Sequence, residues 1–159
     1  MAGFYTAAMA KGFDFERAPA HLIRRAHQLA VSLFMEEAAD FGITPVQFAL
    51  LSALQDEPGQ DQVSLAARVA LDAATSGSVI GRLESKGWVR READAQDRRR
   101  KRLWLTPEGQ AVALQMKRAA SQTQRRLMAP LSAAEREQLS ALLSRLVAAH
   151  EGRVAVDGA

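Results

Sequence analysis

The sequence predicts a mainly α-helical fold with one short β-hairpin. Aromatic residues make up only 6% of the 159 residues while alanine and leucine are abundant, a composition that favours helices over a β-sandwich. Apolar residues recur at three- and four-residue intervals through most of the chain, whereas residues 88–105 contain two short strand-like runs. The predicted order is four helices, the hairpin and two further helices.

The first predicted helix covers about residues 15–40 and follows an N-terminal arm, residues 1–14, that has no clear period. Its apolar stripe is formed by residues spaced three or four apart: Leu22, Ala26, Leu29 and Leu33. Gly42 follows the last periodic residue, as is typical of the end of a helix.

The next three predicted helices are short, and each follows a residue suited to an N-cap. The predicted caps and helices are, in order, Thr44 with residues 45–55, Asp61 with 62–69 and Asp72 with 73–86. Pro45 suits the first helical position, Gln47 completes a capping box with Thr44, and Gly87 ends the third of these helices.

The predicted hairpin has strands at residues 88–91 and 102–105, separated by a charged decade. Thr106 and Pro107 then start a long helix that ends near Met128, before Pro130. A capping box begins the last helix, whose leucine stripe is Leu139, Leu142, Leu143 and Leu146.

Short helices joined by a tight turn and followed by a basic hairpin are typical of a winged helix-turn-helix. The long helices at both ends exceed what such a core needs, and their surplus apolar faces predict a homodimer. The fold class is therefore a winged helix-turn-helix with long N- and C-terminal dimerisation helices. The predicted parts are an arm at 1–14, helical dimerisation regions at 15–43 and 107–150, a winged helix-turn-helix at 44–106 and a tail at 151–159.

Positive charge is concentrated in one short region. Residues 82–102 contain nine basic and four acidic residues, a net charge of +5 in a chain whose total is +3. Such a cluster on a nearly neutral body indicates a site for a polyanion. On the helix at 73–86 and in the hairpin, the candidate contacts to double-stranded DNA are Thr75, Ser76, Ser78, Arg82, Asp97, Arg98, Arg99, Arg100 and Lys101. We interpret Asp97 as a partner that orients the guanidinium of Arg99.

Several classes of function are excluded or disfavoured by composition. The chain has no cysteine, which removes disulfides, thiolate metal sites and cysteine nucleophiles, and its histidines have no metal-ligand spacing. No phosphate-binding, dinucleotide-binding or hydrolase motif is present, so we expect no enzyme, cofactor or metal. The longest uncharged stretch, residues 41–55, is too short for a membrane span, and without a secretory signal the protein is expected to be cytoplasmic.

Several motifs together closely resemble the MarR (multiple-antibiotic-resistance regulator) family, over about residues 20–148. They are Leu65-Ala66-Ala67-Arg68, Leu71-Asp72-Ala73-Ala74-Thr75, Arg82-Leu83-Glu84-Ser85-Lys86-Gly87-Trp88-Val89, Asp97-Arg98-Arg99 and Leu105-Thr106-Pro107-Glu108-Gly109. The resemblance implies a homodimeric transcriptional regulator, most often a repressor, on a pseudo-palindromic operator. It also implies that Arg99 enters the minor groove and that the helix at 73–86 reads the major groove.

Residues 21–28 and 44–48 resemble the branch of the family that regulates aromatic-acid catabolism. This resemblance implies a small-molecule effector, an aromatic carboxylate or its coenzyme A thioester, between the first, second and fifth helices. The candidate effector contacts are His21, Arg24, Arg25 and Phe48. Two alternatives stay open: a constitutive or architectural DNA-binding protein without an effector, and a helical protein-interaction module whose basic hairpin docks an acidic partner.

Overall fold

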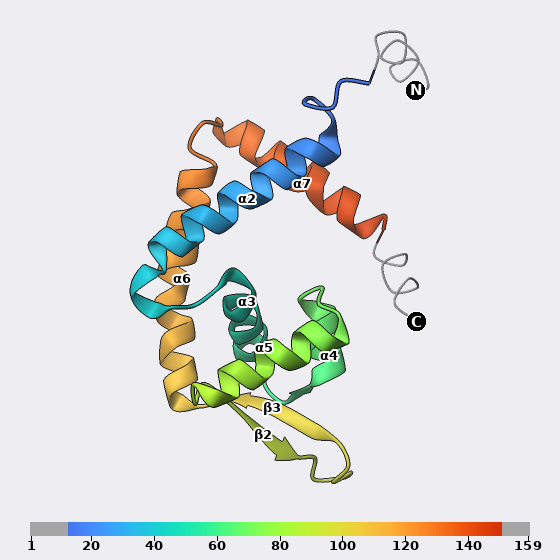
Figure 1. The fold of residues 1–159 in the computed structure, drawn as a ribbon, viewed down its shortest axis with the longest axis vertical. Helices are drawn as coiled ribbons and strands as arrows, with labels where there is room; N and C mark the ends of the chain where they lie inside the picture. Colours follow the sequence, from blue (N-terminus) through green and yellow to red (C-terminus); the bar gives the residue numbers. More distant parts are fainter. Residues whose placement is uncertain (1–12, 151–159) are drawn as a thin grey trace.

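Five helices begin at the N-caps that the sequence predicts. In a computed structural model, which describes residues 13–150, Thr44, Asp61, Asp72, Thr106 and Ser132 each accept a hydrogen bond from the backbone N–H three residues later. Both predicted capping boxes are present, at Thr44 and Ser132. The elements (Figure 1) are α2 (Pro19–Glu37), η1 (Ala39–Phe41), α3 (Pro45–Asp56), β1 (Gln60–Asp61), α4 (Gln62–Arg68), α5 (Ala73–Ser85), β2 (Val89–Ala93), β3 (Lys101–Leu105), α6 (Pro107–Leu127) and α7 (Ala133–Ala148).

Helix α2 begins and ends inside the range predicted for it. It starts at Pro19 rather than near residue 15, because a residue before proline is driven out of the helical region and Ala18 is extended. After Glu37 the chain tightens into η1, and Gly42 then adopts the left-handed conformation with φ 56°. The remaining predicted helices agree with the structure to within a residue or two.

The hairpin is the centre of a three-stranded antiparallel sheet with the strand order β1-β3-β2. Val89 pairs with Leu105 and Ala93 with Lys101, so the basic segment lies at the hairpin tip. The two-residue strand β1 was not predicted, since it is too short to show a period. Its Gln60 side chain is buried and donates hydrogen bonds to the carbonyl oxygens of Ala53 and Glu57.

The hydrophobic core lies beneath α5 and the sheet. Its fully buried apolar side chains come from the residue before the α3 cap and from α3, α4, α5, β3 and α6: Ile43, Leu50, Leu51, Leu54, Leu65, Ile80, Leu83, Leu103 and Met116. Gly109 lies so close to the sheet that a Cβ there would collide with the carbonyl oxygen of Trp88. A larger residue at this position would push α6 away from β2, which explains the glycine in the Leu-Thr-Pro-Glu-Gly motif.

Helix α6 connects two ends of the molecule. At one end it packs beside α3 and the base of the sheet, and at the other it packs against α2 and leads into α7 (Figure 1). Helix α7 contains no buried residue, and its leucine stripe is 36–50% exposed. The predicted mainly helical winged helix-turn-helix is confirmed, whereas most of the predicted arm and the whole tail lie outside the described residues.

Candidate nucleic-acid interface and ligand cavity

Helix α5 presents most of its predicted DNA contacts on an exposed face. Asp72 caps the helix, and Ile80 and Leu83 anchor its other side in the core. The side chains of Thr75, Ser78 and Arg82 are exposed. Small hydroxyls and one long cation on an exposed helix are the kind of surface that enters a major groove.

Ser76 departs from its predicted role as a DNA contact. Its side chain is fully buried, and its hydroxyl donates to the carbonyl oxygen of Ala73 at 3.0 Å. Because successive residues of a helix are turned by 100°, Ser76 lies on the side of α5 that faces the core, whereas Thr75 and Ser78 face solvent. Of the two candidate serines, Ser78 is the one that is exposed.

Asp94 organises the hairpin tip. Its carboxylate is only 8% exposed, forms an ion pair with Arg102, and accepts hydrogen bonds from the backbone N–H groups of Gln96 at 2.7 Å and Asp97 at 3.2 Å. The bond from the Arg102 guanidinium, followed by the two backbone bonds, lowers the pKa of Asp94 to about 2. Asp94 was not among the residues predicted from the sequence. Its position just before the centre of the predicted loop suits an Asx turn, which is the local pattern that could have identified it.

Asp97 also shapes the tip, but differently from the prediction. It accepts a hydrogen bond from the backbone N–H of Arg99 at 3.0 Å, and its carbonyl oxygen accepts from the N–H of Arg100. The expected bond to the guanidinium of Arg99 is therefore replaced by a bond to its main chain. Asp97 fixes the turn, and the Arg99 side chain is exposed to solvent.

The cations of this region divide into two groups. Arg90, Arg91 and Arg102 form ion pairs with Glu92, Glu84 and Asp94 respectively. The first pair lies within β2, the second holds the hairpin to α5, and the third holds the hairpin tip to β3. On α5 and the hairpin tip, the exposed cations that form no ion pair within residues 13–150 are Arg82, Arg98, Arg99, Arg100 and Lys101. Lys86, just after α5, has no ion pair either, but its ammonium group donates to the carbonyl oxygen of Gly42 at 2.8 Å and lies over the ring of Trp88. Only the second group has its charge available for phosphate.

Replacing Asp94 with asparagine is expected to loosen the tip and weaken DNA binding without removing any DNA contact. The ion pair with Arg102 is lost, and a charged hydrogen bond of this kind is typically worth about a tenfold change in an equilibrium. Amide hydrogen exchange at Gln96 and Asp97 should accelerate. Because the folded pKa is lowered, the stabilisation is present above pH 3.8 and is lost as pH falls toward 2. The wild type should therefore lose protection of these two amides in acid, measured against the intrinsic exchange rate at each pH. Unchanged exchange in the variant would contradict the anchoring role.

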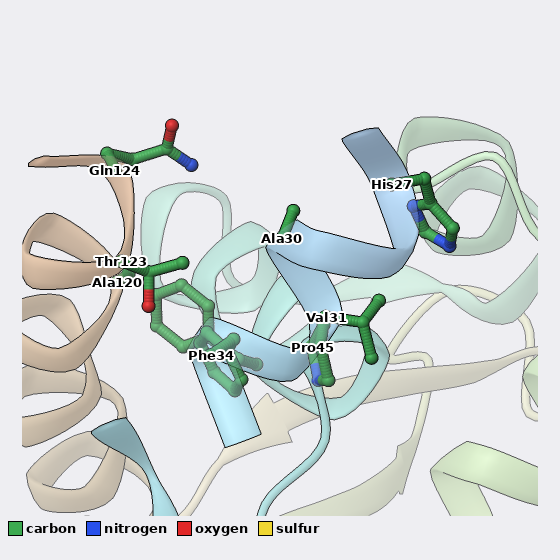
Figure 2. A pocket seen from close by; sticks show the side chains of 9 residues that line it. His27, Ala30, Val31, Phe34, Pro45, Ala120, Thr123 and Gln124 are labelled. Carbon is green, nitrogen blue, oxygen red and sulfur yellow. The ribbon is translucent and has the colours of Figure 1, made fainter. Parts of the chain in front are cut away.

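A cavity of about 210 Å³ lies among α2, α3 and α6. Figure 2 shows its lining, which is apolar except for three side chains; the residues are His27, Ala30, Val31, Phe34, Pro45, Phe48, Ala120, Thr123 and Gln124. Phe34 and Phe48 pack with ring centroids 5.7 Å apart. The hydroxyl of Thr123 donates to the carbonyl oxygen of Ala119, so His27 and Gln124 are the side chains able to donate to a ligand.

The predicted effector residues are only partly gathered at this cavity. Phe48 lines it, whereas His21, Arg24 and Arg25 do not. His21 instead lies 4.4 Å from the ring of Phe15 and accepts from the Arg24 guanidinium at 3.4 Å. Sequence reasoning overlooked His27, although it shares the helical spacing of Ala30, Val31 and Phe34.

A double ion pair holds α2 against α6 next to the cavity. The guanidinium of Arg126 reaches Glu37 and Glu36, each at 2.8 Å. These hydrogen bonds, with that to Glu37 the stronger, raise the pKa of Arg126 above its ordinary value. The cavity walls are thus fixed relative to each other at one end.

Within residues 13–150, no group of three or more histidine, aspartate or glutamate side chains is placed to hold a metal ion. No single helix in this range is long and apolar enough to cross a membrane; α4 and α5 together meet that test by length and composition alone, bent by 105°.

Comparison with known proteins places the chain in a family. The MarR family model matches residues 43–101. The transcriptional regulator HosA of Escherichia coli O127:H6 is 32% identical over 127 residues, which cover 80% of this chain and 93% of HosA. The HTH-type transcriptional repressor NicR of Pseudomonas putida is 32% identical over 139 residues, 87% of this chain and 88% of NicR.

A solved structure agrees with these sequence matches. The structure of Bordetella bronchiseptica BpsR, whose DNA binding is regulated by 6-hydroxynicotinic acid, superposes with a TM-score of 0.81 at 33% identity and covers 84% of this chain and 96% of BpsR. The fold, the exposed cations and the sequence relatives agree with one another. This chain belongs to the MarR family of transcriptional regulators, and it is a DNA-binding regulator rather than an enzyme.

Proposed function

We propose that this protein is a homodimeric, cytoplasmic repressor that binds a pseudo-palindromic operator and is released by an aromatic carboxylic acid. The observation that carries the proposal is the set of five exposed cations on α5 and the hairpin tip that have no ion-pair partner within residues 13–150. Mutually repelling cations held on an ordered hairpin are neutralised when they lie beside phosphate. The repressor activity named for NicR supports the direction of control.

A homodimer accounts for the exposed apolar side chains of the helices near the two ends of the described chain. Residues 19–37 and 133–148 carry exposed apolar side chains, among them Leu22, Leu29, Leu142 and Leu146. Pairing of these faces would place two α5 helices and two hairpins on the same side of a dimer. Such a dimer contacts half-sites about one helical turn apart, which is the origin of the pseudo-palindrome.

The cavity volume favours a free acid over its coenzyme A thioester as the enclosed ligand. Sites that enclose a drug-sized molecule usually measure roughly 300–1,000 Å³, and about 210 Å³ suits a single substituted ring. The phenyl groups of Phe34 and Phe48 would pack against the ring, and His27 and Gln124 would hydrogen-bond its polar substituents. The acid that regulates BpsR belongs to the same chemical class.

Because of its position, the cavity can couple ligand binding to DNA binding. Its lining comes from α2 and α6, at the dimerisation end, and from α3, which packs against α5 and β3. A ligand wedged among these helices changes the angle between the two ends and therefore the spacing of the α5 helices. A coupling of about 1–3 kcal/mol, or 5- to 150-fold in operator affinity, is sufficient for a switch.

The proposal is tested by titrating the protein against the promoter region upstream of its own gene at two salt concentrations. We expect specific binding that falls roughly a thousandfold between 50 and 200 mM salt, as for about six neutralised phosphates. A panel of aromatic acids and their coenzyme A thioesters is then added. Release by a free acid supports the proposal; specific binding that no compound reverses would indicate a constitutive binder. A preference for an acidic protein over duplex DNA would indicate the interaction module.

Replacing His27 with phenylalanine is expected to weaken the response to the acid while operator affinity without ligand stays unchanged. The ring volume is kept, but a hydrogen bond to a charged group is lost, which typically costs roughly 10- to 150-fold in ligand affinity. The measurement is the acid concentration that releases half of the bound DNA. Arg24→Ala is the matched variant, because it tests the cation that the sequence predicted. If Arg24→Ala raises the acid concentration needed for half release and His27→Phe does not, Arg24 in the first turns of α2 binds the acid instead of His27.

A further inference from the structure

The polar side chains of α5 differ in whether their hydrogen-bonding groups are already used. Thr75 donates its hydroxyl to the Asp72 carboxylate at 2.6 Å, and Ser85 donates to the carbonyl oxygen of Gly81 at 2.9 Å. Ser76 is buried, as described above. The Glu84 carboxylate accepts from the guanidinium of Arg91 at 2.9 Å. These four side chains have their strongest groups committed within the protein.

Two polar side chains of α5 remain without a hydrogen-bond partner among residues 13–150. They are Ser78 and Arg82, four residues apart and both exposed. Ala74, four residues before Ser78, is exposed on the same side. Side chains at this spacing lie on one face of a helix, so α5 carries a single stripe of available groups. Gly81, beside Arg82, has open space where a Cβ would lie.

We propose that Arg82 reads one guanine in the major groove of each half-site, and that Ala74 contacts a thymine methyl group in the same half-site. This inference rests on the proposed DNA binding. A guanidinium donates two parallel hydrogen bonds to O6 and N7 of guanine, which is the commonest specific contact of this kind, and an alanine methyl packs on the C5 methyl group of thymine. Ser78 both donates and accepts, so it tolerates several bases and adds little discrimination.

The dimensions of the stripe fit one half-site. Eight residues separate Ala74 from Arg82, which is about 12 Å along a helix axis. Base pairs are stacked about 3.4 Å apart, so the stripe spans roughly three or four base pairs when the helix follows the groove. The guanine and the thymine are therefore expected within a few positions of each other in each half of the operator. Because α5 then has only one side chain that discriminates strongly between bases, we expect the hairpins to supply the remaining sequence specificity.

The experiment selects bound duplexes from a random-sequence pool with four proteins: wild type, Arg82→Ala, Arg82→Lys and Ser85→Ala. We expect a pseudo-palindromic motif with one strongly enriched guanine per half-site for the wild type. Ser85→Ala, whose hydroxyl is used inside the helix, should select the same motif. Arg82→Ala should lose the guanine but keep the remaining positions, whereas Arg82→Lys, which keeps the charge but not the planar pair of donors, should select the guanine more weakly than wild type.

A second measurement uses the selected duplex with 7-deazaguanine at that position, which removes the N7 acceptor. Wild type should bind it more weakly, by an amount within the roughly 5- to 150-fold range of a base contact, whereas Arg82→Ala should bind both duplexes equally. Retention of the guanine by Arg82→Ala, or equal binding of both duplexes by wild type, would show that Arg82 does not read this base and would overturn the inference. Failure of the wild type to enrich any duplex would instead overturn the proposed DNA binding itself.

Discussion

A protein carrying Leu142→Glu and Leu146→Glu is expected to be monomeric and to lose operator binding. These leucines are 50% and 48% exposed on α7, a helix without a single buried residue, so their apolar surface has no partner within the described chain. A charge in a buried apolar interface is costly enough to separate the subunits. A monomer contacts one half-site instead of two, and loss of the second linked contact reduces affinity by roughly 100- to 10,000-fold.

Sedimentation and fluorescence anisotropy with a labelled operator measure the two effects together. The matched control is Ala141→Glu with Ser144→Glu, which adds the same charges on the opposite side of α7, since the two pairs are turned by more than 90° from each other. That variant should remain a dimer that binds DNA. If the leucine variant stays dimeric, the α7 stripe is not the interface; if it is monomeric yet binds the operator at full affinity, two protomers are not required.

Removing the four cations of the hairpin tip is expected to produce the second large effect. Arg98, Arg99, Arg100 and Lys101 are exposed and form no ion pair within residues 13–150, so alanine at these positions should leave the fold intact. Each lost phosphate contact lowers the slope of log affinity against log salt by about 0.9, and a dimer loses its contacts twice. Specific binding should therefore weaken most at low salt and the salt dependence should flatten.

The single variant Arg99→Ala distinguishes a contact with phosphate from insertion into the minor groove. If Arg99 enters a narrow minor groove, as the family resemblance implies, its removal should cost more affinity for the operator than for an unrelated duplex. Lys117→Ala with Arg118→Ala, which removes exposed cations from α6, is the control and should bind almost as tightly as wild type. Equal loss on both duplexes would make Arg99 a phosphate contact, and no loss on either would remove the hairpin from the interface.

Much of the local structure was predictable because it depends on residues close together in the sequence. Thr44 with Gln47, and Ser132 with Glu135, form capping boxes whose partners are three residues apart. Gly42 and Gly87 adopt the left-handed conformation after their helices, with φ of 56° and 72°. Caps, breaks and apolar periods thus located the helices and the hairpin, and their order predicted the winged helix-turn-helix.

The candidate site was predictable as a region but not residue by residue. The two-residue strand β1 depends on a partner far along the chain, Leu103, and the buried Asp94 anchor depends on the hairpin register that brings Arg102 beside it. Similarly, Ser76 and Ser78 are equivalent by composition, and only the packing of α5 turns the first inward and the second outward. The Asx turn at Asp94 and the helical period at the two serines are local signals, whereas the pairing of β1 leaves none.

The sequence by itself determined the type and order of the elements and the concentration of positive charge between residues 82 and 102, because propensity, capping and charge are properties of short segments. Only the tertiary structure decided which of those charges are available. Arg102 and Arg91 form ion pairs with Asp94 and Glu84, whereas Arg82 is exposed and forms no ion pair within residues 13–150. It also placed His27, rather than Arg24, at the cavity, since a cavity exists only where α2, α3 and α6 meet and no single segment encodes that meeting.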